Sequence, residues 1–158
     1  MRRITAEGLA LIRRFEGFSA TIYRCPAGYD TIGYGHVVRE SERARFAAGI
    51  TEAEAEALLA SDVRRAELAV LRLINAPLTD GQFDALVSFV FNLGAAALQR
   101  STLRRKVNRG EHAEVPGELA RWIFAGGQRR RGLIRRRAAE AQRYVAAMVV
   151  APPMRLAA

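Results

Sequence analysis

The spacing of apolar side chains in the first sixteen residues predicts a short helix over residues 5–16. Leu9, Ile12 and Glu16 recur at intervals of three and four positions, which places them on one face of a helix. Thr5 is a residue type that caps the start of a helix through its hydroxyl group. The predicted helix therefore carries a carboxylate at the end of an apolar stripe.

The pattern changes from helical to strand-like after Glu16. Residues 17–38 combine glycines with β-branched and aromatic residues, which is typical of short strands joined by turns. The tripeptide Pro26-Ala27-Gly28 has the composition of a turn. We therefore expect a small antiparallel sheet in this segment.

Two capping boxes mark the starts of long helices further along the chain. Thr51-Glu52-Ala53-Glu54 places a glutamate three positions after a threonine, a pair that satisfies free backbone donors at a helix start. The helix that it opens is predicted to run from 52 to about 74 and to end before Pro77. Thr79-Asp80-Gly81-Gln82 repeats the arrangement, and the segment from there to Gly94 is apolar on most sides. A helix of that kind is expected at the centre of a helical lobe.

The remaining helical signals are shorter. A helix is predicted over 101–108, and another is expected to begin around Val115-Pro116-Gly117 and to carry Trp122. Gly126-Gly127 is predicted to form a loop, and a final helix to run from Leu133 to Met148, before two prolines.

Together these elements predict an α+β fold in a single domain over residues 1–158. A small lobe that contains the sheet is expected over about 17–50. A helical lobe is expected over about 51–150, together with the helix at 5–16. The length is sufficient to bury one hydrophobic core. A cleft between the two lobes is the default position for a binding site.

The net positive charge of the chain indicates which classes of binding partner it favours. The chain has 25 Lys and Arg against 16 Asp and Glu, a formal net charge of +9, and its arginines cluster in the segments 129–131 and 135–137. Such a surface favours polyanions, which include nucleic acid, anionic lipid and an anionic cell wall. We interpret the arginine clusters as a solvated face that also draws the protein onto an anionic surface such as a cell wall.

Several classes are excluded by what the sequence lacks. Cys25 is the single cysteine, so no intramolecular disulfide is possible. No apolar run approaches the ~18–20 residues of a membrane span, and charges interrupt the first twenty residues before any signal-peptide core. We find no zinc-ligand spacing and no phosphate-binding loop, and expect no metal and no cofactor. The protein is expected to accumulate in the cytoplasm, as a monomer without stable membrane insertion.

The candidate chemistry lies in Glu16, Cys25 and Thr31, which follow the spacing E-x8-C-x5-T. Cleavage of a glycosidic bond needs a proton donor for the leaving oxygen and a group that places a nucleophile opposite. A glutamate on an apolar face suits the donor role, because a desolvated carboxyl favours its protonated form. Taken singly, each residue also has an ordinary structural interpretation. Glu16 can be a surface charge, Cys25 a small buried residue and Thr31 a strand residue without a catalytic role.

The sequence segments around these residues resemble those of a known protein family. Arg14-Phe15-Glu16-Gly17-Phe18, followed by Asp30-Thr31-Ile32-Gly33-Tyr34-Gly35-His36, closely resembles the catalytic segment of phage-type lysozymes, glycoside hydrolase family 24. The stretch from Leu78 to Gly94 is similar to that family's core helix. Trp122, Ala125-Gly126-Gly127, Arg136-Arg137 and Glu140 resemble its C-terminal segment, so the likeness runs in order from about residue 4 to 145.

The resemblance implies a lysozyme-like fold and an endolysin that cuts the β-1,4 bonds between N-acetylmuramic acid and N-acetylglucosamine in bacterial peptidoglycan. It implies that Glu16 is the general acid and that Thr31 helps to position the attacking water. Asn92 falls where the family has an amide that lines the cleft. Arg137, or as the second choice Arg136, matches the arginine that pairs with the catalytic glutamate.

The chain departs from the common family pattern at Cys25, where most members have a carboxylate and some have cysteine. As a thiol this residue can help to place a water, and as a thiolate it can polarise the water or attack carbon directly. Both roles stay open, as does the choice between an inverting and a retaining course. Asp30 is an alternative carboxylate, but it is expected to point away if the adjacent Thr31 faces the cleft.

Two residues of types common in active sites, His36 and Trp122, are interpreted as structural. His36 is expected to hold the sheet to a neighbouring carboxylate or carbonyl group rather than to act in catalysis. Trp122 is expected in the core rather than as a platform for a sugar ring, because of its apolar helical neighbours.

Two further functions compete with the enzyme. A basic helical protein that binds nucleic acid would explain the charge but leaves the glycine-rich strand segment unexplained. A catalytically silent module that binds peptidoglycan would explain the missing carboxylate at position 25. The enzyme is preferred to both. It would reach peptidoglycan only after a membrane lesion such as a holin pore, and no nucleic-acid partner is expected.

Overall fold

The structure is a computed structural model that describes residues 1–146 of the chain. The helices are α1 (Ala6–Glu16), α2 (Arg43–Phe46), α3 (Glu52–Leu73), α4 (Asp80–Leu93), α5 (Ala95–Arg100), α6 (Thr102–Asn108), α7 (Val115–Leu119) and α8 (Arg131–Val145). The strands are β1 (Ser19–Arg24), β2 (Asp30–Gly33), β3 (His36–Val37), β4 (Phe124–Ala125) and β5 (Gln128–Arg129). Short 3-10 turns lie at Glu40–Glu42 and His112–Glu114.

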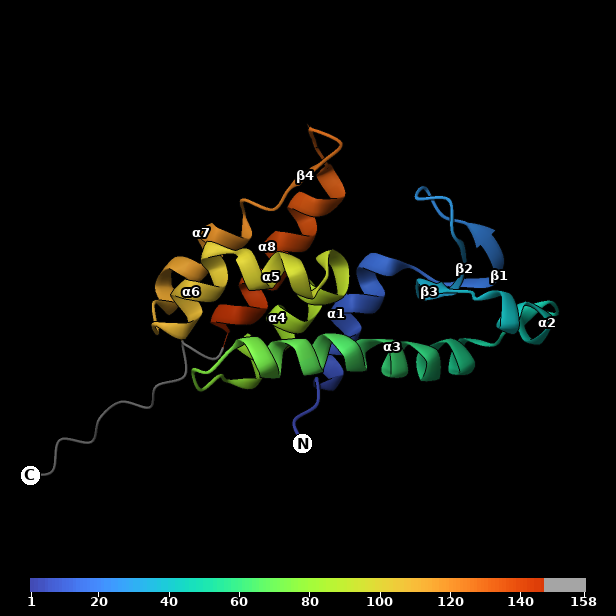
Figure 1. Ribbon diagram of the computed structural model, residues 1–158, viewed down its shortest axis with the longest axis horizontal. Coiled ribbons are helices and arrows are strands. Elements are labelled where there is room, and N and C mark those ends of the chain that lie inside the picture. The colour runs from blue at the N-terminus through green and yellow to red at the C-terminus, as the bar shows by residue number, and fades with distance from the viewer. Residues whose placement is uncertain (147–158) are drawn as a thin grey trace, which may run out of the picture.

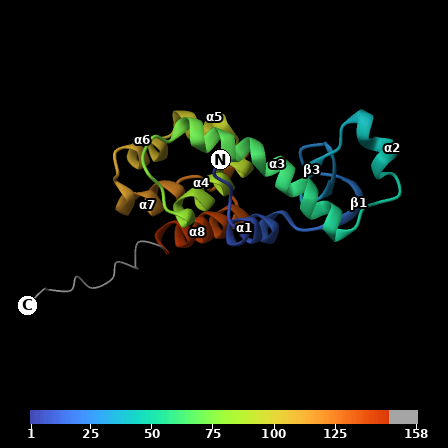
Figure 2. The same cartoon turned by 90° about the horizontal axis from the view of Figure 1, so that it is seen from below.

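The elements form two lobes that share one long helix. Strands β1 to β3 and helix α2 lie at one end of the molecule, and helices α4 to α8 lie at the other (Figure 1). Helix α3 runs beneath both lobes, and the view from below shows it crossing from one to the other (Figure 2). The predicted α+β fold is confirmed. Within residues 1–146, no helix combines the length and the apolar character that crossing a membrane requires.

The predicted helix starts are confirmed in detail. The hydroxyl of Thr5 accepts a hydrogen bond from the backbone N–H of Gly8. Thr51 and Thr79 each form a full capping box with the residue three positions later. These local signals act within one turn of helix, which is why the sequence alone located them.

The predicted sheet is also confirmed. β1 pairs with β2 in antiparallel register, with Tyr23 opposite Thr31, and β2 pairs with β3. The turn between β1 and β2 is closed by two backbone hydrogen bonds, from Cys25 N to Tyr29 O (2.9 Å) and from Gly28 N to Cys25 O (2.8 Å). Cys25 thus lies at the point where the first strand leaves the sheet.

The hydrophobic core of the helical lobe is centred on α4, as its all-round apolar pattern predicted. Phe83, Leu86 and Phe89 of this helix are each at most 1% exposed. A buried carboxylate also holds the lobe together: Asp84 accepts hydrogen bonds from the backbone N–H of Thr5 (2.9 Å) and from Arg143 Nη2 (2.7 Å). This contact joins α1, α4 and α8, so the N-terminal helix is fixed to the larger lobe.

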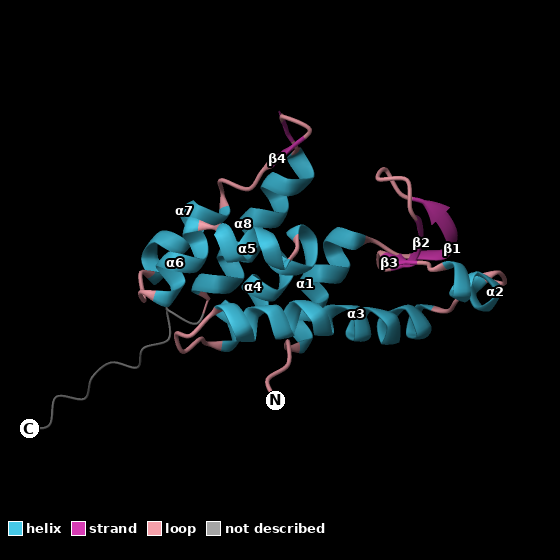
Figure 3. Ribbon diagram, viewed as in Figure 1, coloured by secondary structure: helices cyan, strands magenta, loops and turns pink. Residues whose placement is uncertain are grey.

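Two expectations for the last third of the chain need correction, and the loop predicted at Gly126-Gly127 is present as a tight turn. Helix α7 ends at Leu119, so Trp122 lies beyond it, with its N–H bonded to Leu119 O (3.0 Å). The loop at Gly126-Gly127 is the turn of a hairpin between β4 and β5, because both glycines adopt the positive φ that a tight hairpin turn requires (Figure 3). Helix α8 begins at Arg131 rather than Leu133, and the predicted end at Met148 lies outside the described residues.

Candidate active site

A cavity of about 570 Å³ lies where the two lobes meet. One side comes from β3, the residues that flank it and α3. The other comes from the end of α4, the start of α5 and the end of α1. Its lining residues are Glu16, Gly35, His36, Val37, Arg39, Asp62, Arg65, Ala66, Val90, Phe91, Asn92, Gly94 and Ala95. The predicted cleft between the lobes is therefore present, and Glu16 and Asn92 both line it.

A second hollow of about 250 Å³ lies on another side of Glu16. It is lined by Glu16, Gly17, Phe18, Ser19 and Tyr23. Glu16 therefore borders two separate spaces. An enzyme that cuts within a sugar chain needs such an arrangement, since sugar units must bind on both sides of the bond that is broken.

The Glu16 carboxylate is held by an arginine and stands close to a glycine. Its Oε1 accepts a hydrogen bond from Arg136 Nη1 at 2.6 Å. On the other side lies the backbone of Gly35, where a Cβ atom would stand 3.1 Å from Glu16 Oε2. The side chain is 21% exposed, so one part of it reaches the cavity. The environment is less apolar than the helical stripe predicted, because a guanidinium group from α8 completes it.

The expected pairing of Arg137 with Glu16 is wrong, and the second choice, Arg136, makes the contact. Neighbouring residues on a helix point about 100° apart, so only one of the two can face α1. Arg137 points instead to Glu140 and to Asn92, whose Oδ1 accepts a hydrogen bond from Arg137 Nη2. The interpretation of the segment 135–137 as a solvated face is also wrong for these two arginines, which are both buried.

The two arginines share a buried carboxylate, Glu140, to which no role was assigned from the sequence. Glu140 Oε1 accepts from Ser88 Oγ (2.7 Å) and from Arg136 Nε (3.3 Å), and Glu140 Oε2 lies 3.2 Å from Arg137 Nε. Burial raises the pKa of the Glu140 carboxyl, and burial lowers the pKa of Arg137 to about 10. The available sequence signal was the spacing of three and four residues between these arginines and Glu140 on one helix.

The contact with Arg137 also orients Asn92. Since the carbonyl oxygen of the amide accepts from Arg137, the NH2 group is left to donate. Asn92 lines the cavity, and its remaining donors suit a hydroxyl or carbonyl oxygen of a bound sugar. Arg137 therefore acts on the site through Asn92 and not through Glu16.

Cys25 and Thr31 lie together at the end of the β1–β2 hairpin. The Thr31 hydroxyl donates to Tyr29 O at 3.0 Å. A hydrogen bond from the backbone N–H of Tyr29 lowers the pKa of the Cys25 thiol, although partial burial opposes this. Neither residue lines the two hollows around Glu16. Tyr23, the cross-strand partner of Thr31, lines the smaller one.

Asp30 is paired with basic side chains of the small lobe. Its carboxylate forms an ion pair with Arg43 of α2 and lies 3.9 Å from Arg24. Asp30 is therefore engaged in ion pairs that hold the small lobe together.

The structural interpretations of His36 and Trp122 are confirmed. His36 Nδ1 lies 2.7 Å from Asp62 Oδ2 and its Nε2 lies 3.3 Å from Glu42 Oε2, so the ring joins β3 to α3. The Trp122 ring packs edge-on against Phe89 with ring centroids 5.4 Å apart. No group of three or more His, Cys, Asp or Glu side chains in residues 1–146 is arranged to hold a metal ion.

The two lobes, the cavity between them and a glutamate at its centre define a glycoside hydrolase of the lysozyme type. The phage lysozyme family matches residues 13–140 of this chain. An endolysin of Acyrthosiphon pisum secondary endosymbiont phage 1 is 38% identical over 141 residues, covering 87% of this chain and 94% of the relative. A SAR-endolysin of Escherichia phage Mu is 41% identical, covering 75% of this chain and 67% of the relative.

Solved structures agree with this assignment. The endolysin from Escherichia coli O157:H7 phage FAHEc1 is similar with a TM-score of 0.84 at 33% identity, covering 92% of this chain and 95% of that one. The muramidase domain of SpmX from Asticaccaulis excentricus gives a TM-score of 0.80 at 37% identity, covering 92% and 99%. The chain belongs to the phage lysozyme family, and the predicted lysozyme-like fold is confirmed.

Proposed function

We propose that this protein is an endolysin muramidase, which hydrolyses the β-1,4 bonds between N-acetylmuramic acid and N-acetylglucosamine in bacterial peptidoglycan. The observation that carries the proposal is that Glu16 lines both the interlobe cavity and a second hollow beside it. Relatives that are named endolysins support the lytic role, and a structural neighbour is named a muramidase domain.

In the proposed reaction Glu16 is the general acid. It donates a proton to the glycosidic oxygen as the bond to the sugar breaks, which requires a carboxyl group within hydrogen-bond reach of that oxygen. Arg136 holds the carboxyl group in place, and the absence of a side chain at Gly35 leaves room for it. Asn92, which lines the same cavity, binds an oxygen of the sugar chain.

The direct test is Glu16→Gln, with the release of new reducing ends from purified peptidoglycan as the measurement. Glutamine keeps the shape of the side chain but has no carboxyl proton to give, so activity should be lost while the protein stays folded. Glu40→Gln is the matched control, because Glu40 is 91% exposed and lines neither hollow. Activity of Glu16→Gln within tenfold of the unaltered protein would refute the assignment.

We further propose that Cys25 and Thr31 place the attacking water. Aspartate at position 25 accepts hydrogen bonds and can act as a base, so Cys25→Asp should keep or raise activity. Cys25→Ala should lose much of it, and Cys25→Ser should fall between the two. A dead Cys25→Asp variant, together with a glycan adduct trapped on the thiol, would instead make the thiolate the nucleophile.

The exposed arginines at the β4–β5 hairpin are proposed to draw the enzyme onto the anionic wall. Arg129, Arg130 and Arg131 are all exposed, and the hairpin projects from the helical lobe (Figure 1). Reversing these three charges should slow the attack on intact walls more than on soluble glycan fragments, and salt should have the same effect. An equal loss on both substrates would contradict steering.

The place of action is the cell wall, and we propose that the enzyme waits in the cytoplasm as a monomer until a membrane lesion such as a holin pore admits it. Four of the relatives are named SAR-endolysins, which makes the route of access a point for direct measurement. Fractionation of intact expressing cells should recover the protein in the cytoplasm. Recovery from the periplasm without a holin would contradict this route.

A further inference from the structure

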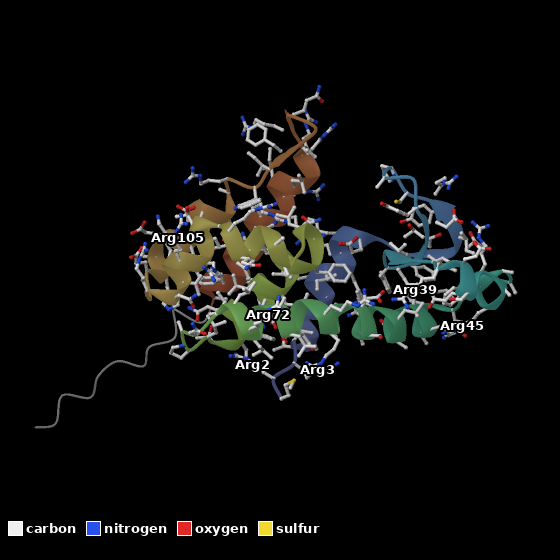
Figure 4. The ribbon with its side chains drawn as sticks, in the orientation of Figure 1. Arg2, Arg3, Arg39, Arg45, Arg72 and Arg105 are labelled. Carbon is white, nitrogen blue, oxygen red and sulfur yellow. The ribbon has the colours of Figure 1, made fainter. Side chains whose placement is uncertain are left out.

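Two arginines line the same cavity as Glu16 without any role in holding that residue. Arg39 directly follows Val38 at the end of the β3 segment, and Arg65 lies on α3 one helical turn after Asp62. Both side chains are exposed and both belong to the lining of the cavity. The contact between His36 and Asp62 (2.7 Å) fastens β3 to α3, so the two arginines come from segments with a fixed relative position. Figure 4 shows Arg39 on the small-lobe side of the molecule.

Neither guanidinium group has a carboxylate within 4 Å among residues 1–146, whereas the acids around them are engaged elsewhere. Glu16 is bound by Arg136, and Asp62 is bound by His36. Glu42 accepts a hydrogen bond from the backbone N–H of Arg39 (3.0 Å) and lies 3.3 Å from His36 Nε2. The cavity therefore holds two cations whose charges are not neutralised by a direct partner from these acids.

We propose that Arg39 and Arg65 form a subsite that binds a carboxylate carried by the sugar chain. This inference rests on the proposed function and adds a charge preference to it. Each muramic acid unit has a lactyl carboxyl group, which is a free carboxylate in peptide-free strands. In peptide-bearing strands that group is an amide, and the carboxylates lie on the peptide instead. A guanidinium group binds a planar carboxylate through two parallel N–H donors, which suits either source.

The test compares three glycan substrates: peptide-bearing strands, peptide-free strands, and peptide-free strands whose carboxyl groups are converted to the neutral methylamide. We expect the unaltered enzyme to prefer a carboxylate substrate over the methylamide by about tenfold in kcat/KM, through a lower KM. Arg39→Gln/Arg65→Gln should remove most of this preference and leave the kcat ratio of the two substrates unchanged. Of the peptide-free and peptide-bearing strands, the one whose kcat/KM falls more in the double variant carries the carboxylate that the two arginines bind.

The matched control is Arg72→Gln/Arg100→Gln. It removes two exposed arginines that line no part of the cavity, and Figure 4 places Arg72 toward the helical lobe. The control should keep the substrate preference, because the net charge falls by the same amount in both double variants. An equal loss in the control, or an unchanged preference in Arg39→Gln/Arg65→Gln, would overturn the subsite.

A binding measurement separates this inference from the proposed reaction. Calorimetry on the Glu16→Gln protein should show the same preference, about tenfold in Kd, for the carboxylate strand over the methylamide. Adding Arg39→Gln and Arg65→Gln to that protein should remove most of the preference. If the unaltered protein releases no reducing ends from any substrate, the proposed function fails. If it cleaves all three equally, and binding shows no preference, the carboxylate subsite alone fails.

Discussion

The buried charges behind Glu16 allow one substitution to be worked out in detail, Glu140→Gln. Glu140 is fully buried and is the only carboxylate within 4 Å of Arg137 among residues 1–146. Arg136 has a second partner in Glu16, but Arg137 does not. Glutamine preserves the size of the side chain and can still accept from Ser88. The substitution therefore removes a charge while leaving the packing almost unchanged.

The expected cost follows from the burial of Arg137, which is 1% exposed. Removing one partner of a buried ion pair leaves an uncompensated charge and costs about 3–5 kcal/mol. For a chain of this size, each kcal/mol lowers the melting temperature by about 2–4 °C, which gives a decrease of about 6–20 °C. The loss is a large part of a typical stability of about 5–15 kcal/mol. Activity should fall as well, because Arg136 loses one of the contacts that hold it beside Glu16.

Urea unfolding followed by circular dichroism, together with thermal melting, measures the effect. Glu114→Gln is the control, since it breaks the pair with Lys106 at a glutamate that is 57% exposed and should cost no more than about 1 kcal/mol. Arg137→Met combined with Glu140→Gln should cost less than the sum of the single changes, because no unpaired charge remains. A loss below about 1 kcal/mol for Glu140→Gln would refute the reasoning.

Two further predictions concern the small lobe. Alkylation of Cys25 by iodoacetamide should reach half its maximal rate at a lower pH in the folded protein than in the urea-unfolded chain, because a hydrogen bond from the Tyr29 N–H favours the thiolate; an equal or higher midpoint in the folded protein would contradict this. Gly35→Ala should lower kcat on peptidoglycan at least tenfold, because the added Cβ would stand 3.1 Å from the carboxylate of the proposed proton donor. Gly127→Ala has the same left-handed backbone, with φ +74 against +84, but no neighbour within 4 Å, so it should cost stability without changing kcat; equal kcat values in the two variants would show that the contact is unimportant.

Much of the fold was visible in the sequence because its signals are local. The capping boxes at Thr51 and Thr79 act within a single turn, and the alternation of residues in 17–38 reflects strands whose turn is closed by neighbours in the chain. The hairpin at Gly126-Gly127 was missed because its strands are two residues each, too short to show an alternating pattern. The end of α7 was misplaced for a related reason: Trp122 has helical spacing from Leu119, but it packs on Phe89 from outside the helix.

The sequence by itself determined that Glu16 ends an apolar helical face, that Cys25 and Thr31 follow it at the family spacing, and that His36 and Trp122 have structural roles. Only the tertiary structure decided which arginine reaches Glu16, because Arg136 and Arg137 are adjacent and of one residue type. The choice depends on how α8 is rotated against α1 and α4, which is set by long-range packing. The same is true of Arg39 and Arg65, whose position beside Glu16 exists only once β3 and α3 have come together.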